Sequence, residues 1–341
     1  MRKKELLATG IKTLGAWPLV RGVRHLSGAE LVVLAYHRVL DVGEESQYEF
    51  DPELVSASPE EFEWQMRFVR DNFDVLSFKD VGDHVQGRAR LPRRPLVVTF
   101  DDGFDDNYHH AFRILKNVGI AATFFISTGY IGTDRIFWFD WLAHLLMRAP
   151  PGTVRIPELP AALPASSDVA ARRAATNQLL AKIKTLSERR RSEILLELEA
   201  LGREFGIRTA SAASRPMTWE QVIEMHRGGM EIGSHTVSHP ILSTMEPDAL
   251  RFELTQSKAE IESRLNVPVR VIGYPVGTSD AFNAEVVASV RAAGYELGCS
   301  YVPGTNPLRD LDRFRLRRQH IERYTSRVYF EALLSLPSLM S

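Results

Sequence analysis

Two pairs of polar residues in this sequence have types and spacing that could perform chemistry. Asp101 and Asp102 stand side by side directly after the apolar run PLVVTF, and His235 and His239 lie four residues apart in GSHTVSHP. A spacing of four predicts that both imidazoles lie on one side of a single helical turn, as two ligands of one metal require. Two neutral histidines and one carboxylate leave coordination positions open, which is typical of a catalytic metal site. Strand-end histidines that only make hydrogen bonds are the alternative interpretation.

The two adjacent aspartates are costly unless each charge is compensated, because two like charges in contact raise one another's pKa. A cation would resolve the conflict. Asp102 would bind it, and Asp101 would stay ionised and accept a proton from a water molecule activated by that cation. Asp-Asp-Gly, which ends at Gly103, is also a good turn sequence before a helix, so turn chemistry is the alternative explanation.

Buried strands must position these side chains. Short apolar runs predict strands at 31–39, 95–100 and 120–127. Strands and helices alternate again after residue 215, which indicates βαβ units around a parallel sheet. We count six to eight units, so the predicted fold class is α/β, with a closed or distorted (β/α) barrel preferred to an open sheet. The strand ends would then gather the aspartates, the histidines and the Tyr274-Pro275 pair at one rim.

Two segments depart from this alternation. Residues 1–30 predict an N-terminal helical extension with basic and apolar residues, which could touch a membrane peripherally, although packing on its own domain is the preferred interpretation. Residues from about 138 to 215 predict a helical insertion within a barrel domain that spans 31–341. The run of arginines at 189–191 in this insertion predicts a solvated helix face.

Composition argues against a nucleic-acid partner, and the N-terminal residues favour a location in the cytoplasm or at its membrane surface. The 42 basic and 43 acidic residues give no general attraction for phosphates, so we expect no nucleic-acid partner. The single cysteine, Cys299, is expected to be a small buried core residue. Glu5, Lys12 and Pro18 interrupt any signal-peptide core, and no apolar run could span a bilayer, which favours the cytoplasm or its membrane surface.

The motifs together resemble a known family, the polysaccharide deacetylases of carbohydrate esterase family four, which share the nodulation protein B homology domain. TFDDG (99–103) matches the family's first motif, and HTVSH (235–239) matches its second. The likeness extends from about residue 31 to 322 and includes YHRV (36–39), Asn107 and GYPVG (273–277). It implies a distorted (β/α) barrel of about seven units. It also implies Asp101 as the catalytic base and a divalent metal, usually Zn²⁺, held by Asp102, His235 and His239.

The sequence departs from the family pattern at two functional positions. Gly273 stands where the third motif commonly has an arginine that steadies the base, so Arg270 or Arg318 could take that role. The late motif that supplies the general acid is not clear, and His320 is a weak match to it. The sequence resembles the exopolysaccharide deacetylase subgroup, which has a histidine after the first strand, so we prefer His37 as the general acid.

The hypothesis for function is therefore metal-dependent removal of N-acetyl groups from an amino-sugar glycan. Trp138, Tyr274, Pro275 and Arg318 are the residues expected to bind that substrate. An O-acetyl esterase, a deacetylase of a lipid-linked sugar precursor and a glycan-binding protein without turnover are the alternatives. The sequence does not indicate an oligomeric state.

Overall fold

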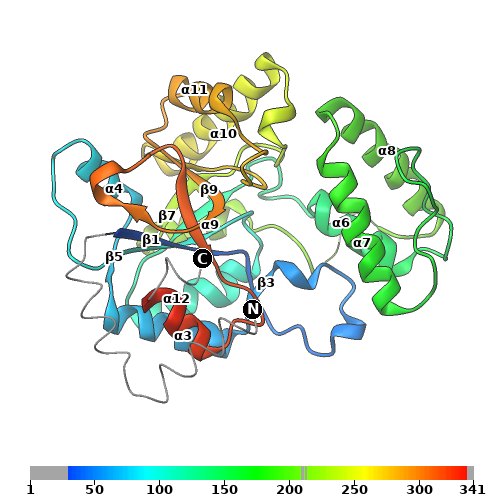
Figure 1. Ribbon diagram of the computed structural model, residues 1–341, viewed down its shortest axis with the longest axis horizontal. Coiled ribbons are helices and arrows are strands. Elements are labelled where there is room, and N and C mark those ends of the chain that lie inside the picture. The colour runs from blue at the N-terminus through cyan, green and yellow to red at the C-terminus, as the bar shows by residue number, and fades with distance from the viewer. Residues whose placement is uncertain (1–29, 209–210, 212, 336–341) are drawn as a thin grey trace.

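A closed barrel of parallel strands forms the centre of the molecule (Figure 1). The computed structural model describes residues 30–208, 211 and 213–335. Within these residues seven strands form the ring, and each pairs in parallel with both neighbours. In order around the ring they are β1 (Glu30–Tyr36), β11 (Leu316–His320), β9 (Leu297–Pro303), β8 (Val271–Gly273), β7 (Glu231–Ser234), β6 (Thr123–Ile126) and β5 (Pro95–Phe100). The closed, distorted barrel predicted from the sequence is confirmed.

Helices cover the outside of this ring and link most of its strands. They are α3 (Pro59–Asn72), α4 (Phe78–Val85), α5 (Arg113–Val118), α9 (Trp219–Arg227), α10 (Pro247–Leu265), α11 (Ala284–Ala292) and α12 (Arg327–Ser335). The connection from β9 to β11 has no α-helix. It contains β10 (Asn306–Pro307), which pairs antiparallel with β1, and a short 3₁₀ turn, η5 (Leu308–Asp310). This connection departs from the alternation of strands and helices in the rest of the barrel.

Short elements lie in the connections between the barrel strands and the helices. They are β2 (Arg38–Val39), β3 (Val55–Ala57), β4 (Asp74–Val75), the 3₁₀ turns η1 (Glu45–Gln47), η2 (Pro52–Leu54) and η4 (Leu242–Thr244), and the π-helix η3 (Asn107–Phe112). The apolar run at 31–39, predicted as one strand, therefore divides between β1 in the barrel and β2 in a separate two-stranded sheet.

The strands are apolar on both faces because each is covered on both sides. Along β1, Leu31 and Val33 belong to a cluster inside the barrel, whereas Val32 and Leu34 pack outward against the helices. Side chains that alternate along a strand reach both layers, which explains why these strands read as continuous apolar runs. Cys299 lies in the inner cluster and is fully buried, as predicted.

Between β6 and α9 the chain leaves the barrel and forms three helices: α6 (Trp138–Arg148), α7 (Val169–Lys184) and α8 (Glu188–Glu204). They lie beside the barrel, at the right of Figure 1, and enclose an apolar cluster of their own that includes Trp141, Leu179 and Leu198. The prediction for the arginine run is wrong at one position. Arg189 is solvated, but Arg191 is buried, with its guanidinium 5.8 Å from the centre of the Trp138 ring.

The predicted N-terminal extension and its membrane contact fall almost entirely on residues 1–29, which lie outside the described residues. Among the helices that the structure describes, none combines the length and apolarity needed to cross a bilayer.

Candidate active site

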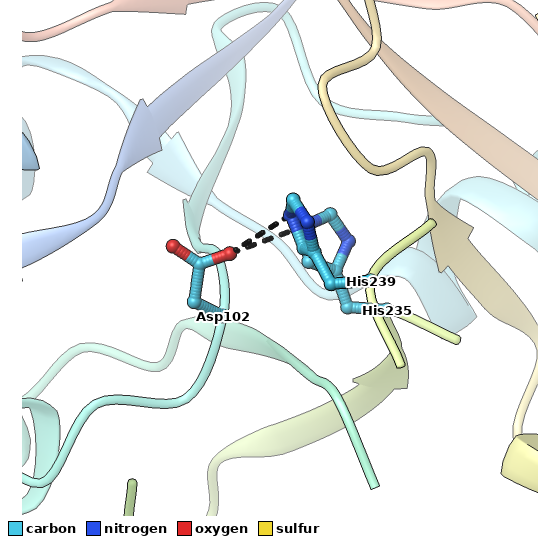
Figure 2. Close-up of side chains that lie close together, drawn as sticks. All are labelled: Asp102, His235 and His239. Atoms are coloured by element: carbon cyan, nitrogen blue, oxygen red, sulfur yellow. Dashed lines mark ion pairs between the residues drawn. The ribbon is translucent and has the colours of Figure 1, made fainter. Parts of the chain in front are cut away.

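Three side chains from two strand ends converge on one point (Figure 2). Asp102 follows β5, and His235 and His239 follow β7. Asp102 Oδ1 lies 3.5 Å from His235 Nε2 and 3.3 Å from His239 Nε2, and all three residues are buried. The structure thus brings together the three residues expected to bind a metal.

The chemistry of this cluster fits a divalent cation. Both carboxylate oxygens of Asp102 are buried, and neither accepts a hydrogen bond within the described part of the chain. A buried carboxylate without donors is unfavourable, and a cation would compensate it. Burial lowers the pKa of His235 to about 4 and that of His239 to about 3, so both imidazoles are neutral, the form that binds metal.

A backbone carbonyl orients one of these imidazoles. His235 Nδ1 lies 2.8 Å from the carbonyl oxygen of Gly273, at the end of β8. A proton on Nδ1 would be donated to this oxygen, leaving the lone pair of Nε2 directed towards Asp102. Figure 2 shows both rings facing the carboxylate from the same side.

The segment that carries the histidines is a loop, so the predicted helical turn is wrong. Thr236 and His239 have left-handed φ angles of 68° and 57°, which a right-handed helix does not allow. Glu253 of α10 holds the loop, because its carboxylate accepts hydrogen bonds from the backbone of Val237 at 2.7 Å and Ser238 at 3.0 Å. The two rings therefore converge through a fixed loop, although a spacing of four residues had suggested a helix.

An ion pair holds the second aspartate, Asp101. Arg318 of β11 donates from Nη1 and Nη2 to the two carboxylate oxygens, each at 2.7 Å, and from Nε to the carbonyl of Ser300 at 2.7 Å. Burial alone would raise the pKa of Asp101, but the charge and hydrogen bonds of Arg318 hold it well below the usual range. Asp101 is therefore ionised beside the three expected metal ligands.

Arg318 thus takes the place of the arginine that the third motif lacks. It was expected to bind substrate, but it is fully buried and is not among the residues that line the cavity. Arg270 instead pairs with Glu296 at 2.6 Å. Position 273 could not hold a side chain without displacement, because a Cβ there would lie 3.0 Å from the Phe125 ring.

His37 lies close to Asp101. Its Nε2 is 3.9 Å from Asp101 Oδ2, and its side chain is 19% exposed. The backbone of His37 is fixed at both ends of the residue, because its N–H donates to Ser56 Oγ at 3.0 Å and its carbonyl accepts from Asn107 Nδ2 at 2.8 Å. Burial lowers the pKa of His37, while Asp102 and Asp101 counteract that shift.

His320, the weaker match for a general acid, lies behind an aromatic ring. It stacks on Tyr301 with 3.6 Å between ring centres, and Tyr301 also contacts His37 edge-on. His37 and Tyr301 line the cavity, whereas His320 does not.

These groups open into a cavity of about 300 Å³. Its lining comprises His37, Asp51, Glu53, Leu54, Asp101, Asp102, Trp138, Phe139, Leu180, Lys184, His235, His239, Tyr274, Val276, Thr278 and Tyr301. Two of the residues expected to bind substrate, Trp138 and Tyr274, are present, but Pro275 is buried and is not part of the lining. Trp138 Nε1 also donates to the His239 carbonyl at 3.2 Å, so α6 helps to hold the backbone of this expected metal ligand.

Sequence reasoning missed several parts of the lining. Sequence patterns give no reason to place Asp51, Glu53, Leu180 and Lys184 beside the three expected metal ligands, because these four residues come from segments outside the barrel. The Tyr274 N–H donates to the Cys299 carbonyl at 2.9 Å and is not free to bind a substrate oxygen.

Comparison with known proteins places these residues in a family. The family model described as polysaccharide deacetylase matches residues 88–298, which include both aspartates and both histidines. The chain belongs to the polysaccharide deacetylase family. Among relatives in this family, YxkH of Bacillus subtilis (strain 168), provisionally named a polysaccharide deacetylase, is 22% identical over 294 residues, 86% of this chain and 72% of YxkH.

A shorter match links the chain to a deacetylase named for its substrate. The poly-β-1,6-N-acetyl-D-glucosamine N-deacetylase of Staphylococcus aureus (strain MSSA476) is 29% identical over 89 residues, 26% of this chain and 30% of that protein. Solved structures of the family share the fold. The Streptococcus pyogenes deacetylase PplD has a TM-score of 0.58 at 20% identity, with 88% of this chain and 96% of PplD covered. IcaB from Ammonifex degensii has a TM-score of 0.57 at 20% identity, with 90% and 98% covered.

Proposed function

We propose that this chain is a metal-dependent deacetylase that removes N-acetyl groups from an amino-sugar glycan. One observation carries the proposal. The buried carboxylate of Asp102, which accepts no hydrogen bond within the described residues, faces two neutral imidazoles, while the ionised carboxylate of Asp101 lies beside them in the same cavity. Membership of the polysaccharide deacetylase family supports an acetylated glycan as the substrate class.

Asp102, His235 and His239 would hold the cation. Two imidazole nitrogens and one carboxylate oxygen suit Zn²⁺ and leave further coordination positions for water and substrate. A divalent cation bound there would act as a Lewis acid on the acetyl carbonyl and would favour ionisation of a nearby water molecule.

Asp101 is the residue that would take the proton from that water. Its low pKa makes it a carboxylate at neutral pH, and Arg318 fixes the direction of its two oxygens. A base with a low pKa is weak in bulk water, but positioning within hydrogen-bond reach of the reacting water compensates for much of this weakness. Arg318 is therefore a positioning residue for the base.

His37 would donate a proton to the departing amine, because it lines the cavity next to Asp101. The N–H of Val276 would stabilise the oxyanion. Val276 lines the cavity with a left-handed φ of 61°, and its N–H has no hydrogen-bond partner within the described residues. A β-branched residue in this conformation is strained, and such strain is often found where the backbone serves a site.

Acetate release tests the proposal. The full chain would be treated with chelator, supplied with one equivalent of Zn²⁺, and assayed with N-acetylglucosamine oligomers linked β-1,4 and β-1,6. The second linkage is included because it occurs in the substrate for which the Staphylococcus aureus relative is named. We expect acetate release that depends on the metal and is lost in Asp101→Asn.

The same assay separates the alternatives. Faster release from O-acetylated sugars would make the chain an esterase, and release only from a lipid-linked acetylated sugar would identify a precursor as the substrate. Metal and glycan binding without release from any of these compounds would refute the proposed hydrolysis and indicate a binding protein.

A further inference from the structure

The end of the barrel opposite the expected metal ligands has a basic loop. The strands begin at this end, and α4 closes it. Phe78 and Val81 of α4 belong to the inner apolar cluster, and the Phe78 N–H donates to the carboxylate of Glu231, the first residue of β7, at 2.8 Å. From α4 the chain reaches the start of β5 through residues 86–94, the arginine loop, which contains four arginines and no acidic residue.

Half of the positive charge of the arginine loop is not compensated within the described residues. Arg88 and Arg94 pair with acidic side chains of α4 and β4. Arg90 and Arg93 are exposed, and neither makes an ion pair or a hydrogen bond in the part of the chain that the structure describes. These two guanidinium groups therefore remain available to an anionic partner.

The N-terminal segment, residues 1–29, joins the barrel beside the arginine loop. Strand β1 pairs with β5 so that Val32 lies opposite Leu96, and the same register puts Glu30 level with Arg94. Figure 1 shows β1 starting at the left, in dark blue, and running towards α6–α8. Residues 1–29 contain six basic residues and one acidic residue, a net charge of +5. Two basic segments therefore meet at one end of the barrel.

The rest of the chain has the opposite charge. The arginine loop contributes +4 and the whole chain has a net charge of −1 at pH 7, so the residues outside these two segments have −10. Charge separated in this way orients a protein on a negatively charged surface. The arginine loop would face that surface and the cavity would face away from it, because the six residues of β5 separate the two ends by about 20 Å.

We propose that this end of the barrel binds a lipid bilayer that contains anionic phospholipids. Arg90 and Arg93 attract the lipid phosphates, and the N-terminal segment adds apolar side chains that enter the boundary between headgroups and acyl chains. Stable peripheral binding generally requires two such contributions together. The large apolar residues of the segment are Leu6, Leu7, Ile11, Leu14, Trp17, Leu19 and Val20.

The position of the arginine loop decides between the bilayer and two other partners. From the sequence alone, packing of the N-terminal segment on its own domain was preferred. A basic segment that starts beside the arginine loop would be repelled by like charge if it packed there, so the structure favours the bilayer. A nucleic acid would leave the apolar residues of the segment in water, which is unfavourable.

Co-sedimentation of the full chain with lipid vesicles tests the proposal. Vesicles of phosphatidylcholine alone would be compared with vesicles in which about one third of the lipid is phosphatidylglycerol. We expect binding to the anionic vesicles only, and weaker binding when the ionic strength is raised from about 0.01 M to about 0.15 M, because salt screens the attraction. Absence of binding to the anionic vesicles, or equal binding to both kinds, would overturn the proposal.

Two double variants locate the binding surface. One basic residue near an anionic surface contributes about a fivefold factor in affinity, so Arg90→Gln with Arg93→Gln should weaken vesicle binding about 25-fold. Arg189→Gln with Arg203→Gln is the matched control, since these arginines are also exposed but belong to α8, across the molecule from the start of β1. Equal affinities of the two double variants would refute the assignment to this end of the barrel. Far-ultraviolet circular dichroism would verify that both variants are folded.

A variant of the N-terminal segment and a competitor complete the test. Ile11→Glu should weaken vesicle binding, because a carboxylate is unfavourable among acyl chains, and unchanged binding would exclude the segment from the surface. Duplex DNA at the same phosphate concentration should not displace the vesicles. Full displacement would indicate a general attraction for phosphate and would refute the bilayer as the partner. None of these measurements uses enzymatic activity, so their outcome is independent of the proposed hydrolysis.

Discussion

Replacing Arg318 by methionine should destabilise the protein strongly and leave the proposed base, Asp101, without the partner that fixes its position. Arg318 is fully buried and donates two hydrogen bonds of 2.7 Å to Asp101, so methionine would leave a buried carboxylate without its partner. Breaking a buried ion pair in this way costs about 3–5 kcal/mol. Two further hydrogen bonds, to Ser300 and Thr99, would also be lost.

Urea unfolding at pH 7, followed by tryptophan fluorescence, would measure this loss. Arg270→Met is the matched control, since Arg270 pairs with Glu296 at a partly exposed position, where such pairs contribute about 0–1 kcal/mol. The double variant Asp101→Asn, Arg318→Met should recover part of the loss, because it removes the stranded charge. Equal losses for Arg318→Met and Arg270→Met would refute the argument that the buried pair supports the site.

The pH profile distinguishes a positioning role from a purely structural one. Asp101 must be ionised to act as a base, so activity falls as pH drops through its pKa. Arg318 holds that pKa low, and burial without Arg318 would raise it. The acidic limb of the kcat/KM profile should therefore move to higher pH in Arg318→Met. An unchanged limb would mean that Arg318 acts only on stability.

Three further outcomes follow from the geometry. Asp101→Asn should keep near-normal zinc content by elemental analysis while acetate release falls by about 10²-fold or more, and loss of zinc would mean that the roles of the two aspartates are wrongly divided. Gly273→Ala should weaken zinc binding in a chelator competition, because its Cβ would lie 3.1 Å from Nδ1 of His235; unchanged affinity would show that the ring adapts freely. Burial raises the pKa of Asp140 to about 6, against the charge of Arg38. The contribution of Asp140 to the free energy of unfolding is therefore fully present below about pH 4 and is lost as the pH rises through about 6. Urea unfolding of Asp140→Asn over this pH range should show a free energy of unfolding that lacks this decrease.

The sequence was sufficient to predict the barrel and the convergence of Asp102, His235 and His239, because both are visible as short patterns in the sequence. Continuous apolar runs indicated strands covered on both faces, and the polar residues after them marked the strand ends. Once the strands are parallel, their ends meet at one rim, so Asp102 and the two histidines had to approach one another.

The rest depends on contacts that leave no local pattern. Strand β11, LRRQH, was not predicted because its buried positions include Arg318 and Gln319, which hide the apolar alternation. Arg318 finds its partner in Asp101, and only the closed barrel brings the two together. The loop at 235–239 misled the prediction because the left-handed backbone at Thr236, a β-branched residue, has no signature in sequence.

The position of Arg318 on the last strand of the ring has a consequence for biosynthesis. The acid that would remove the proton and the arginine that fixes it are 217 residues apart in the chain. At about 5–20 residues per second, the ribosome needs on the order of ten seconds or longer to add that stretch. Until β11 has emerged and inserted between β1 and β9, a nascent chain can have the metal ligands but not a correctly held base. Catalytic competence should therefore arise late, in one step with closure of the barrel.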